Sequence, residues 1–440
     1  MTRTRDEWRR VFRDFDPYRE LTTEEFPTLY ASRPRAASSR LMAAIEEATR
    51  PEQVRLLLAG ARGSGKSTEL LRLLTHLSRG EAVVLPLYVD VAAALPTGGT
   101  SLLGWLPVVA LEVQAELARY PKARRTDGLK RALGALAGKE TSEAVVGTFA
   151  ALGALATAAA DPTGATGALA VGRGVVASIA ATRKVLDAIQ ANLAEGKAAA
   201  ADREALVDSL AADLVALRDV VGLPVMLLLD GLDKLATVEE VRHALDDVDL
   251  LYRMPGGLVL SSPLQLASDP QFAANLTPGR LRPVHLHNLP VVDHDGKPRE
   301  EGIAVLRELF RLRWQATGLT GALVPDPLID ALARWSSGVV REFLELVRLA
   351  AQAARGDERD VVTEADVRAA VRERRMAYEF SLTTEDWDQL ALVRASGERP
   401  TARLDELLFT NVVASYPNDG LWFRPNELLI PHLDARAARS

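Results

Sequence analysis

The chain has 440 residues, of which 48% are hydrophobic and 25% charged, with a formal net charge of −6. This composition is typical of a globular protein with room for two or three domains, and it excludes a disordered chain and a globally basic, nucleic-acid-binding one. The absence of cysteine excludes disulfides and thiolate metal sites. The first residues are charged and contain no apolar signal core, so we expect a cytoplasmic protein.

Residues 1–50 are predicted to form a polar leader followed by one helix in the segment "ASSRLMAAIEEATR". Between residues 51 and 295, short apolar runs alternate with helical patterns. This alternation predicts an α/β domain, in which helices cover both faces of a parallel sheet. The expected strands are 54–59, 82–91, 223–230, 256–262 and 281–289.

The first expected strand leads into a glycine-rich loop and a leucine-rich helix. The sequence from Gly60 to Ser67 matches G-x-x-x-x-G-K-[ST], the phosphate-binding loop of P-loop NTPases. Glycines let successive backbone N–H groups surround phosphate oxygens, and the helix N-terminus adds partial positive charge. We expect Lys66 to reach the β- and γ-phosphates of ATP and Ser67 to bind Mg²⁺. The expected nucleotide-binding residues here are Gly60, Ala61, Arg62, Gly63, Ser64, Gly65, Lys66, Ser67 and Thr68.

Residues 121–200 are rich in alanine and glycine, and we expect a helical hairpin inserted into the α/β domain. Apolar residues and one threonine recur there at steps of four and three: Val175, Ile179, Thr182, Leu186, Ile189 and Leu193. This heptad-like spacing favours burial against another helix. The alternative is that residues 144–182 enter a membrane. We disfavour it because a spanning helix needs about 20 predominantly apolar residues, and alanine adds little to insertion.

The strand 223–230 ends at Asp230, which in this topology opens onto the crevice above the carboxyl ends of the strands. A carboxylate there can hold the water shell of Mg²⁺. Many ATPases place a glutamate directly after this aspartate to polarise the attacking water, but here Gly231 occupies that position. Asp233 is the nearest carboxylate in sequence, and it either orients water or caps the following helix. We expect hydrolysis to be slow in either case.

The pattern becomes helical beyond residue 295. We expect a helical lid over residues 296–378, with Thr363 and Asp366 as a helix-start pair. Residues 379–440 are predicted to form a small winged helix, whose hairpin turns at Pro417–Gly420. The mixed charge of that segment argues against strong binding to a phosphate backbone.

These motifs resemble the AAA+ and STAND group of P-loop ATPases, between the initiator-type and NACHT-like branches. "DGLDKL" is similar to the D-G-x-D-E form of NACHT-like ATPases, with Lys234 where an acidic residue is usual. "SSGVVREFLELVRLA" resembles the sensor-2 helix of initiator-type lids, which implies that Arg341 lies over the γ-phosphate.

The resemblance also implies two further positions. Sensor 1 would be Ser261 or Ser262, at the end of the strand "GGLVLSS". An arginine finger before the last strand would be Arg280 or Arg282. The alternative interpretation of Arg280 and Arg282 is that they are two solvated arginines in a loop.

The resemblance implies a switch that binds ATP or ADP with Mg²⁺ and hydrolyses ATP slowly. The nucleotide state of such a switch would control homo-oligomer assembly or the engagement of a protein partner, as in bacterial signalling and defence. The first alternative is a DNA-associated initiator or loader ATPase whose winged helix touches duplex. The second is a membrane-acting effector that uses residues 144–182.

Overall fold

The structure is a computed structural model that describes residues 3–19, 21–22, 24–34, 36–79, 83–94, 102–123, 127–159, 180–195, 197, 200–235, 237–243, 245, 249–269, 272, 274, 276, 280–398, 404–418 and 420–438. The chain forms two compact units. The unit that we call the sheet unit comprises Ala37–Ala59 and Glu69–Val284, and the lid unit comprises Met1–Ala36, Gly60–Thr68 and His285–Ser440.

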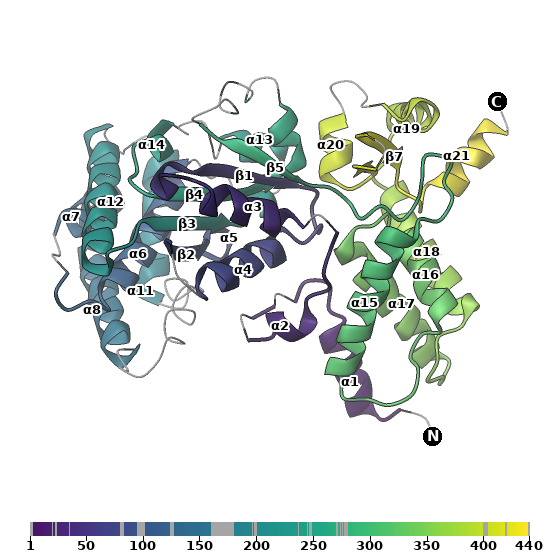
Figure 1. Ribbon diagram of the computed structural model, residues 1–440. Coiled ribbons are helices and arrows are strands. Elements are labelled where there is room, and N and C mark those ends of the chain that lie inside the picture. Colours follow the sequence, from purple (N-terminus) through teal and green to yellow (C-terminus); the bar gives the residue numbers. More distant parts are fainter. Residues whose placement is uncertain are drawn as a thin grey trace. The chain divides into compact units, whose positions relative to one another are not determined.

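Five strands form one sheet in the order β2-β3-β4-β1-β5 (Figure 1). They are β1 (Arg55–Gly60), β2 (Leu85–Asp90), β3 (Val225–Asp230), β4 (Gly257–Pro263) and β5 (Arg282–Leu286). The β2–β3 and β3–β4 pairings are parallel. Every residue of β3 is buried, as expected for a continuous apolar run covered on both faces. The predicted α/β class and all five predicted strands are confirmed.

The sheet unit also contains the expected inserted helices. The helices α6 (Leu102–Leu117), α7 (Gly128–Ala137), α8 (Ser142–Ala159), α11 (Ala180–Ala194) and α12 (Ala200–Val221) pack against one another. The other helices in the described part of this unit are α3 (Ala37–Glu46), most of α4 (Lys66–Leu77), α5 (Val91–Ala94), α13 (Val238–His243) and α14 (Asp249–Tyr252). The expected hairpin is therefore part of a larger helical bundle.

Residues 104–117 of α6 are all buried, which fits a helix that is apolar on nearly every side. The heptad-like face of α11 is buried at Thr182, Leu186 and Ile189, whereas Val175 and Ile179 lie outside the described residues. Within the described part of the chain, no helix is long and apolar enough to cross a membrane.

Asp213 on α12 is a carboxyl group inside this bundle. It is 1% exposed, and Gln114 Nε2 on α6 donates a hydrogen bond to its Oδ2 at 2.6 Å. Burial raises the pKa of the Asp213 carboxyl from 3.8 to about 6. The folded state therefore binds this proton more tightly than the unfolded state does, and ionisation of Asp213 costs stability as the pH rises from about 4 to about 6.

We predict that Asp213→Asn raises the free energy of unfolding near pH 7.5 by about 1–2 kcal/mol, after allowance for solvent screening. Asparagine keeps an acceptor for Gln114 but carries no charge. At about pH 3 the gain should vanish, because this lies below the ordinary pKa of 3.8, so Asp213 is protonated in the folded state and largely so in the unfolded state. Urea unfolding at the two pH values measures the difference, and an equal effect at both would contradict the prediction.

The lid unit contains the predicted helical segment, formed by α15 (Glu300–Ala316), α16 (Asp326–Trp335), α17 (Val340–Gly356) and α18 (Glu364–Glu379). The predicted Thr363–Asp366 pair forms a capping box at the start of α18. The C-terminal segment continues with α19 (Thr384–Ser396), α20 (Leu404–Phe409), the antiparallel hairpin β6 (Val413–Tyr416) and β7 (Trp422–Pro425), and α21 (Ile430–Ala437). One apolar core runs through both segments, so the expected boundary at residue 378 does not divide the core.

The N-terminal segment differs from the expected polar leader, because it contains the helices α1 (Arg5–Asp14) and α2 (Phe26–Leu29). A capping box of Thr4 and Glu7 starts α1, and Trp8 and Val11 are buried. Phe15 packs against Phe310 of α15, with ring centroids 5.1 Å apart. Because the segment is highly charged, the apolar residues that recur in it at helical spacing are not evident from its composition.

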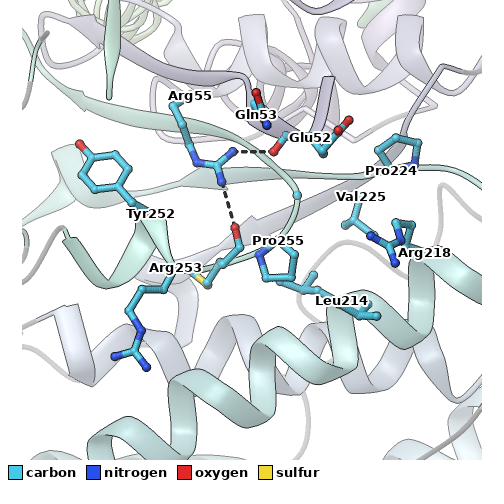
Figure 2. A pocket seen from close by; sticks show the side chains of 13 residues that line it. Glu52, Gln53, Arg55, Leu214, Arg218, Pro224, Val225, Tyr252, Arg253 and Pro255 are labelled. Carbon is cyan, nitrogen blue, oxygen red and sulfur yellow. Dashed lines mark hydrogen bonds between the residues drawn. The ribbon is translucent and has the colours of Figure 1, made fainter. Parts of the chain in front are cut away.

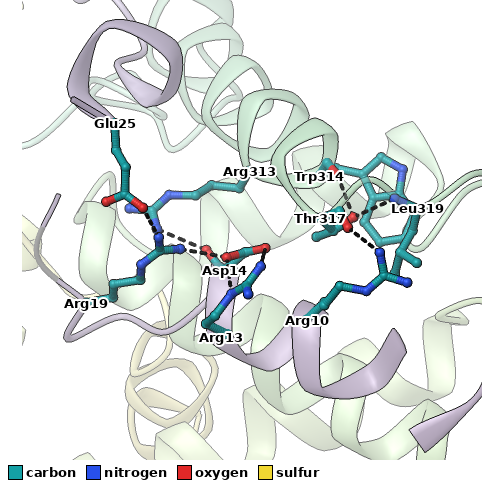
Figure 3. Close-up of polar contacts among 9 residues, drawn as sticks. All are labelled: Arg10, Arg13, Asp14, Arg19, Glu25, Arg313, Trp314, Thr317 and Leu319. Carbon is teal, nitrogen blue, oxygen red and sulfur yellow. Dashed lines mark hydrogen bonds and ion pairs between the residues drawn. The ribbon is translucent and has the colours of Figure 1, made fainter. Parts of the chain in front are cut away.

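Buried polar contacts attach the end of α1 to α15 (Figure 3). Asp14 is 1% exposed and accepts hydrogen bonds from Arg13 and Arg19, while Arg313 Nη1 donates to the Asp14 carbonyl oxygen at 2.9 Å. Burial, with Arg19 nearby, lowers the pKa of Arg313 to about 10. The N-terminal segment is therefore an integral part of the lid unit.

Candidate nucleotide site

The glycine-rich loop that is predicted to bind phosphate follows β1 and ends at the first residue of α4, as the motif predicts. Lys66 is that first residue and is 3% exposed. Its Nζ donates hydrogen bonds to the carbonyl oxygens of Gly60 at 2.8 Å and Ala61 at 2.9 Å. The ammonium group is thus held against the loop, at the end of the helix where an anion is stabilised.

Two groups inside the loop suit a phosphate ligand. Ser64 is 1% exposed, and its buried hydroxyl has no hydrogen-bond partner in the part of the chain that the structure describes. A buried polar group without a partner costs free energy, which a phosphate oxygen could offset. Ser67 is half-buried in the first turn of α4, and its hydroxyl oxygen is of the kind that Mg²⁺ prefers.

Arg341 in α17 lies against the loop at Gly63. Its backbone N–H donates to the Gly63 carbonyl oxygen at 3.2 Å. Gly63 has φ +77°, and a Cβ placed there would lie 2.7 Å from the Arg341 Cβ. This position therefore requires glycine, both for its backbone conformation and for the close approach of α17. The guanidinium group of Arg341 stands over the ring of Tyr18, 5.3 Å from its centroid.

Two contacts to the loop were missed by sequence reasoning. Arg33 Nη2, from the N-terminal segment, donates to the Ser64 carbonyl oxygen. Asn411, just after α20, donates from Nδ2 to the Arg62 carbonyl oxygen at 2.9 Å, and the Arg62 guanidinium lies over the ring of Phe409. No sequence motif marks Arg33 or Asn411, because both come from segments distant along the chain.

A cavity of about 50 Å³ adjoins the loop within the lid unit. Its walls come from the N-terminal segment, the start of α4, α15 and α17. They include Leu21, Tyr30, Gly65, Thr68, Leu309 and Val340. The lining is mostly apolar but also includes Arg33 and Arg313, and the cavity is well below the roughly 300 Å³ of typical ligand pockets.

Asp230 ends β3 and is completely buried. Tyr88 Oη, on β2, donates to its Oδ2 at 2.7 Å, and Ser261 Oγ, on β4, donates to its Oδ1 at 2.8 Å. The predicted sensor Ser261 therefore orients the Asp230 carboxylate here, whereas Ser262 Oγ donates to the Pro263 carbonyl oxygen at 3.2 Å. Tyr88 was missed, because an aromatic residue in an apolar strand gives no polar signal.

Asp90, at the end of β2, is a second carboxylate at this edge of the sheet. It is the register partner of Asp230 in the β2–β3 pair. Its Oδ1 accepts from the Ala92 backbone N–H at 3.1 Å, and its Oδ2 lies 3.1 Å from Lys234 Nζ. Sequence reasoning missed Asp90, although it ends an apolar strand just as Asp230 does.

The remaining predicted residues lie as follows. Asp233 is in the 3₁₀ turn Leu232–Lys234, and its side chain lies outside the described residues. Arg280 is exposed, stands over the ring of Tyr252 at 5.2 Å and pairs with Asp249 at 3.2 Å. The structure thus gives Arg280 partners within the sheet unit, which leaves its role as an arginine finger a prediction.

A larger cavity, of about 280 Å³, lies at the amino ends of β1, β3 and β4, opposite to the edge that carries Asp230 (Figure 2). Arg55 points into this region, but its guanidinium donates to the carbonyl oxygens of Glu52 and Met254, both at 2.9 Å. Arg55 is therefore satisfied by backbone groups, and the other two arginines that line the cavity, Arg218 and Arg253, pair with Asp219 and Asp208.

A scan against protein-family models returns no match, and a search of curated proteins returns none either. Among solved structures, the chain is similar to Cdc6p from Pyrobaculum aerophilum, at 14% identity, covering 95% of this chain and 97% of that chain with a TM-score of 0.37. It is similar to Aeropyrum pernix ORC1 in complex with DNA (15% identity, 93% and 96% covered, TM-score 0.37). It is also similar to the ADP form of Aeropyrum pernix ORC2 (13% identity, 98% of both chains covered, TM-score 0.43). Scores at this level identify neither a family nor a function for this chain.

Proposed function

We propose that this chain is an ATP-binding, slowly hydrolysing switch ATPase of the AAA+/STAND type, in which the bound nucleotide controls self-assembly or the engagement of a protein partner. The observation that carries the proposal is the loop Gly60–Lys66, with a lysine at the head of α4 and with Arg341 and Asn411 bonded to its backbone. In this proposal the loop binds the phosphates of the nucleotide.

The proposal keeps the Mg²⁺ ligands predicted from the sequence, Ser67 in the lid unit and Asp230 in the sheet unit. The donor set fits, because a hydroxyl and a carboxylate supply the hard oxygen ligands that this ion takes. Asp230 accepts hydrogen bonds from Tyr88, Ser261 and the Gly231 N–H. A carboxylate has about four lone-pair sites, which leaves capacity for a water of the metal's hydration shell. When bound, Mg²⁺ would neutralise part of the phosphate charge.

The contact between the C-terminal segment and the loop favours a switch over a DNA-associated initiator. Asn411 Nδ2 donates a hydrogen bond to the carbonyl oxygen of Arg62, and the ring of Phe409 packs on the Arg62 guanidinium. A phosphate that reorganises this loop would disturb both contacts, and so would pass the nucleotide state to the C-terminal segment. We expect such a switch to alternate between two arrangements of the chain and to exchange its nucleotide slowly.

The test is a calorimetric titration of the whole chain with ADP and with a slowly hydrolysed ATP analogue, each with and without Mg²⁺, combined with native mass measurement. We expect binding that Mg²⁺ strengthens, together with an assembly state that differs between the two nucleotides. Absence of binding to either nucleotide would overturn the proposal. Salt-dependent binding of duplex DNA, with no change in assembly, would favour the initiator function instead.

Arg341→Ala should weaken the triphosphate state more than the diphosphate state. One charge-assisted hydrogen bond to phosphate contributes about 1.5–3 kcal/mol, so we expect affinity for the ATP analogue to fall about 10- to 100-fold and ADP affinity to change little. Arg372→Ala, on the exposed face of α18, is the charge-matched control. Equal losses for both nucleotides would show that Arg341 only supports the loop backbone.

A further inference from the structure

The residues from Asp16 to Arg19 form a tight turn just after α1, and Tyr18 lies at its tip. The Arg19 backbone N–H donates to the Asp16 carbonyl oxygen at 3.2 Å, and the Tyr18 N–H donates to Asp16 Oδ1 at 2.9 Å. Pro17, at the second position, has the fixed φ that such a turn favours, and aspartate at the first position commonly bonds to the backbone two residues on. The local sequence therefore sets the conformation of this turn.

The neighbours of Tyr18 anchor the turn on the lid unit. Pro17 is buried, Arg19 Nη1 donates to Asp14 Oδ1 at 2.6 Å, and Arg19 also pairs with Glu25 (Figure 3). Tyr18 itself is 71% exposed, so its ring contributes little to the core. Packing in the core therefore does not explain why this anchored turn presents a tyrosine.

The Tyr18 ring contacts the charged group of Arg341, whose Cζ lies 5.3 Å from the ring centroid. The side chain of the same arginine runs past the glycine-rich loop, because a Cβ placed on Gly63 would lie 2.7 Å from Arg341 Cβ and 3.4 Å from Arg341 Cδ. Tyr18, Arg341 and Gly63 all belong to the lid unit. Two contacts therefore fix Arg341 at the loop: its backbone N–H bonds to Gly63, and its guanidinium lies over the ring of Tyr18.

We propose that Tyr18 is a positioning residue, which holds the Arg341 guanidinium at the loop and thereby strengthens the binding of a nucleoside triphosphate relative to a diphosphate. The inference rests on the proposed function, in which Arg341 contacts the γ-phosphate. A cation is attracted to the face of an aromatic ring, whereas the five N–H donors of a guanidinium lie in its own plane. The contact with Tyr18 uses the charge of Arg341 and leaves its donors for phosphate oxygens.

Preorganisation is the physical reason for the gain in affinity. A free arginine side chain has many rotamers, and fixing them when a ligand binds costs free energy. The contact with Tyr18 restricts the guanidinium before the nucleotide arrives, so part of this cost is not incurred on binding. Because a cation–π contact at an exposed site is weak, the expected gain in affinity is about 2- to 5-fold.

The experiment titrates the full chain with ADP and with a slowly hydrolysed ATP analogue, both with Mg²⁺, and compares three variants of Tyr18. Tyr18→Ala and Tyr18→Leu should lower the affinity for the ATP analogue about 2- to 5-fold and leave ADP affinity unchanged. Tyr18→Phe keeps the ring and should bind both nucleotides as the wild type does. Phe380→Ala, which removes an aromatic side chain that is 96% exposed in the same unit, is the matched control. Thermal unfolding of each variant checks that it is folded.

A double-mutant cycle with Arg341→Ala tests whether Tyr18 acts through this arginine. In the Arg341→Ala background, Tyr18→Ala should have no further effect, because the ring then has no cation to hold. The inference would be overturned if the two losses added, if Tyr18→Phe lost as much affinity as Tyr18→Leu, or if Tyr18→Ala changed ADP and ATP-analogue affinity equally. A rise in ATP-analogue affinity in Tyr18→Ala would also overturn it, because the ring would then draw Arg341 away from the ligand. Absence of nucleotide binding by the wild type would overturn the proposed function, and the inference with it.

Discussion

Lys66→Ala is expected to lower the affinity for ATP and ADP at least about 100-fold. In the proposed site this ammonium group binds the phosphates, and each charge-assisted hydrogen bond to phosphate contributes about 1.5–3 kcal/mol. In the structure Nζ donates to two loop carbonyl oxygens, at 2.8 Å and 2.9 Å, which holds the charge inside the loop. Titration with both nucleotides, in the presence of Mg²⁺, measures the loss.

The fold should tolerate this change. Lys66 contacts loop carbonyls through its ammonium group, and water can replace those bonds once the side chain is shortened. Lys184→Ala removes the same charge from the exposed side of α11 and should leave affinity unchanged. If Lys66→Ala bound nucleotide as tightly as Lys184→Ala does, the loop would not be a phosphate site.

The sheet could be predicted because its strands are short apolar runs that end at recognisable residues. β1 ends at the first glycine of a phosphate-binding motif, and β3 ends at Asp230. Local pattern therefore located both halves of the expected site. The helix α1 was missed because its apolar residues Trp8 and Val11, and Phe15 just after it, are interleaved with arginines and acids. Only the packing on α15 shows that these residues are part of the core.

The polar groups around Asp230 could not be predicted from the sequence, because the order of the strands in the sheet brings them together. Tyr88 and Asp90 reach Asp230 and Gly231 only because β2 pairs with β3 across some 140 intervening residues. Ser261 was placed at the right strand end, but its contact with Asp230 depends on β4 being the neighbour on the other side. Asn411 meets Arg62 from the far end of the chain.

The apolar spacing of α11 is explained by packing within the inserted bundle. The four-three spacing predicted that one face of α11 would be buried against another helix, and α11 packs against α6, α7 and α8 of the same chain. Leu186 is 2% exposed and Ile189 is completely buried there. This face therefore stabilises the sheet unit itself, so its disruption should affect folding before it affects any partner.

Leu186→Asp is accordingly expected to destabilise the protein by about 3–5 kcal/mol. The substitution removes a packed leucine, which alone costs about 2–5 kcal/mol on truncation, and it buries a carboxylate. Urea unfolding measures the loss, which should diminish below about pH 4 because the new carboxyl can then be buried in its neutral form. Lys184→Asp, on the exposed side of the same helix, introduces the same group in water and should change stability by no more than about 0.5 kcal/mol. A stable Leu186→Asp variant with altered self-association would contradict this expectation, because it would mean that this face of α11 contacts a partner and not its own bundle.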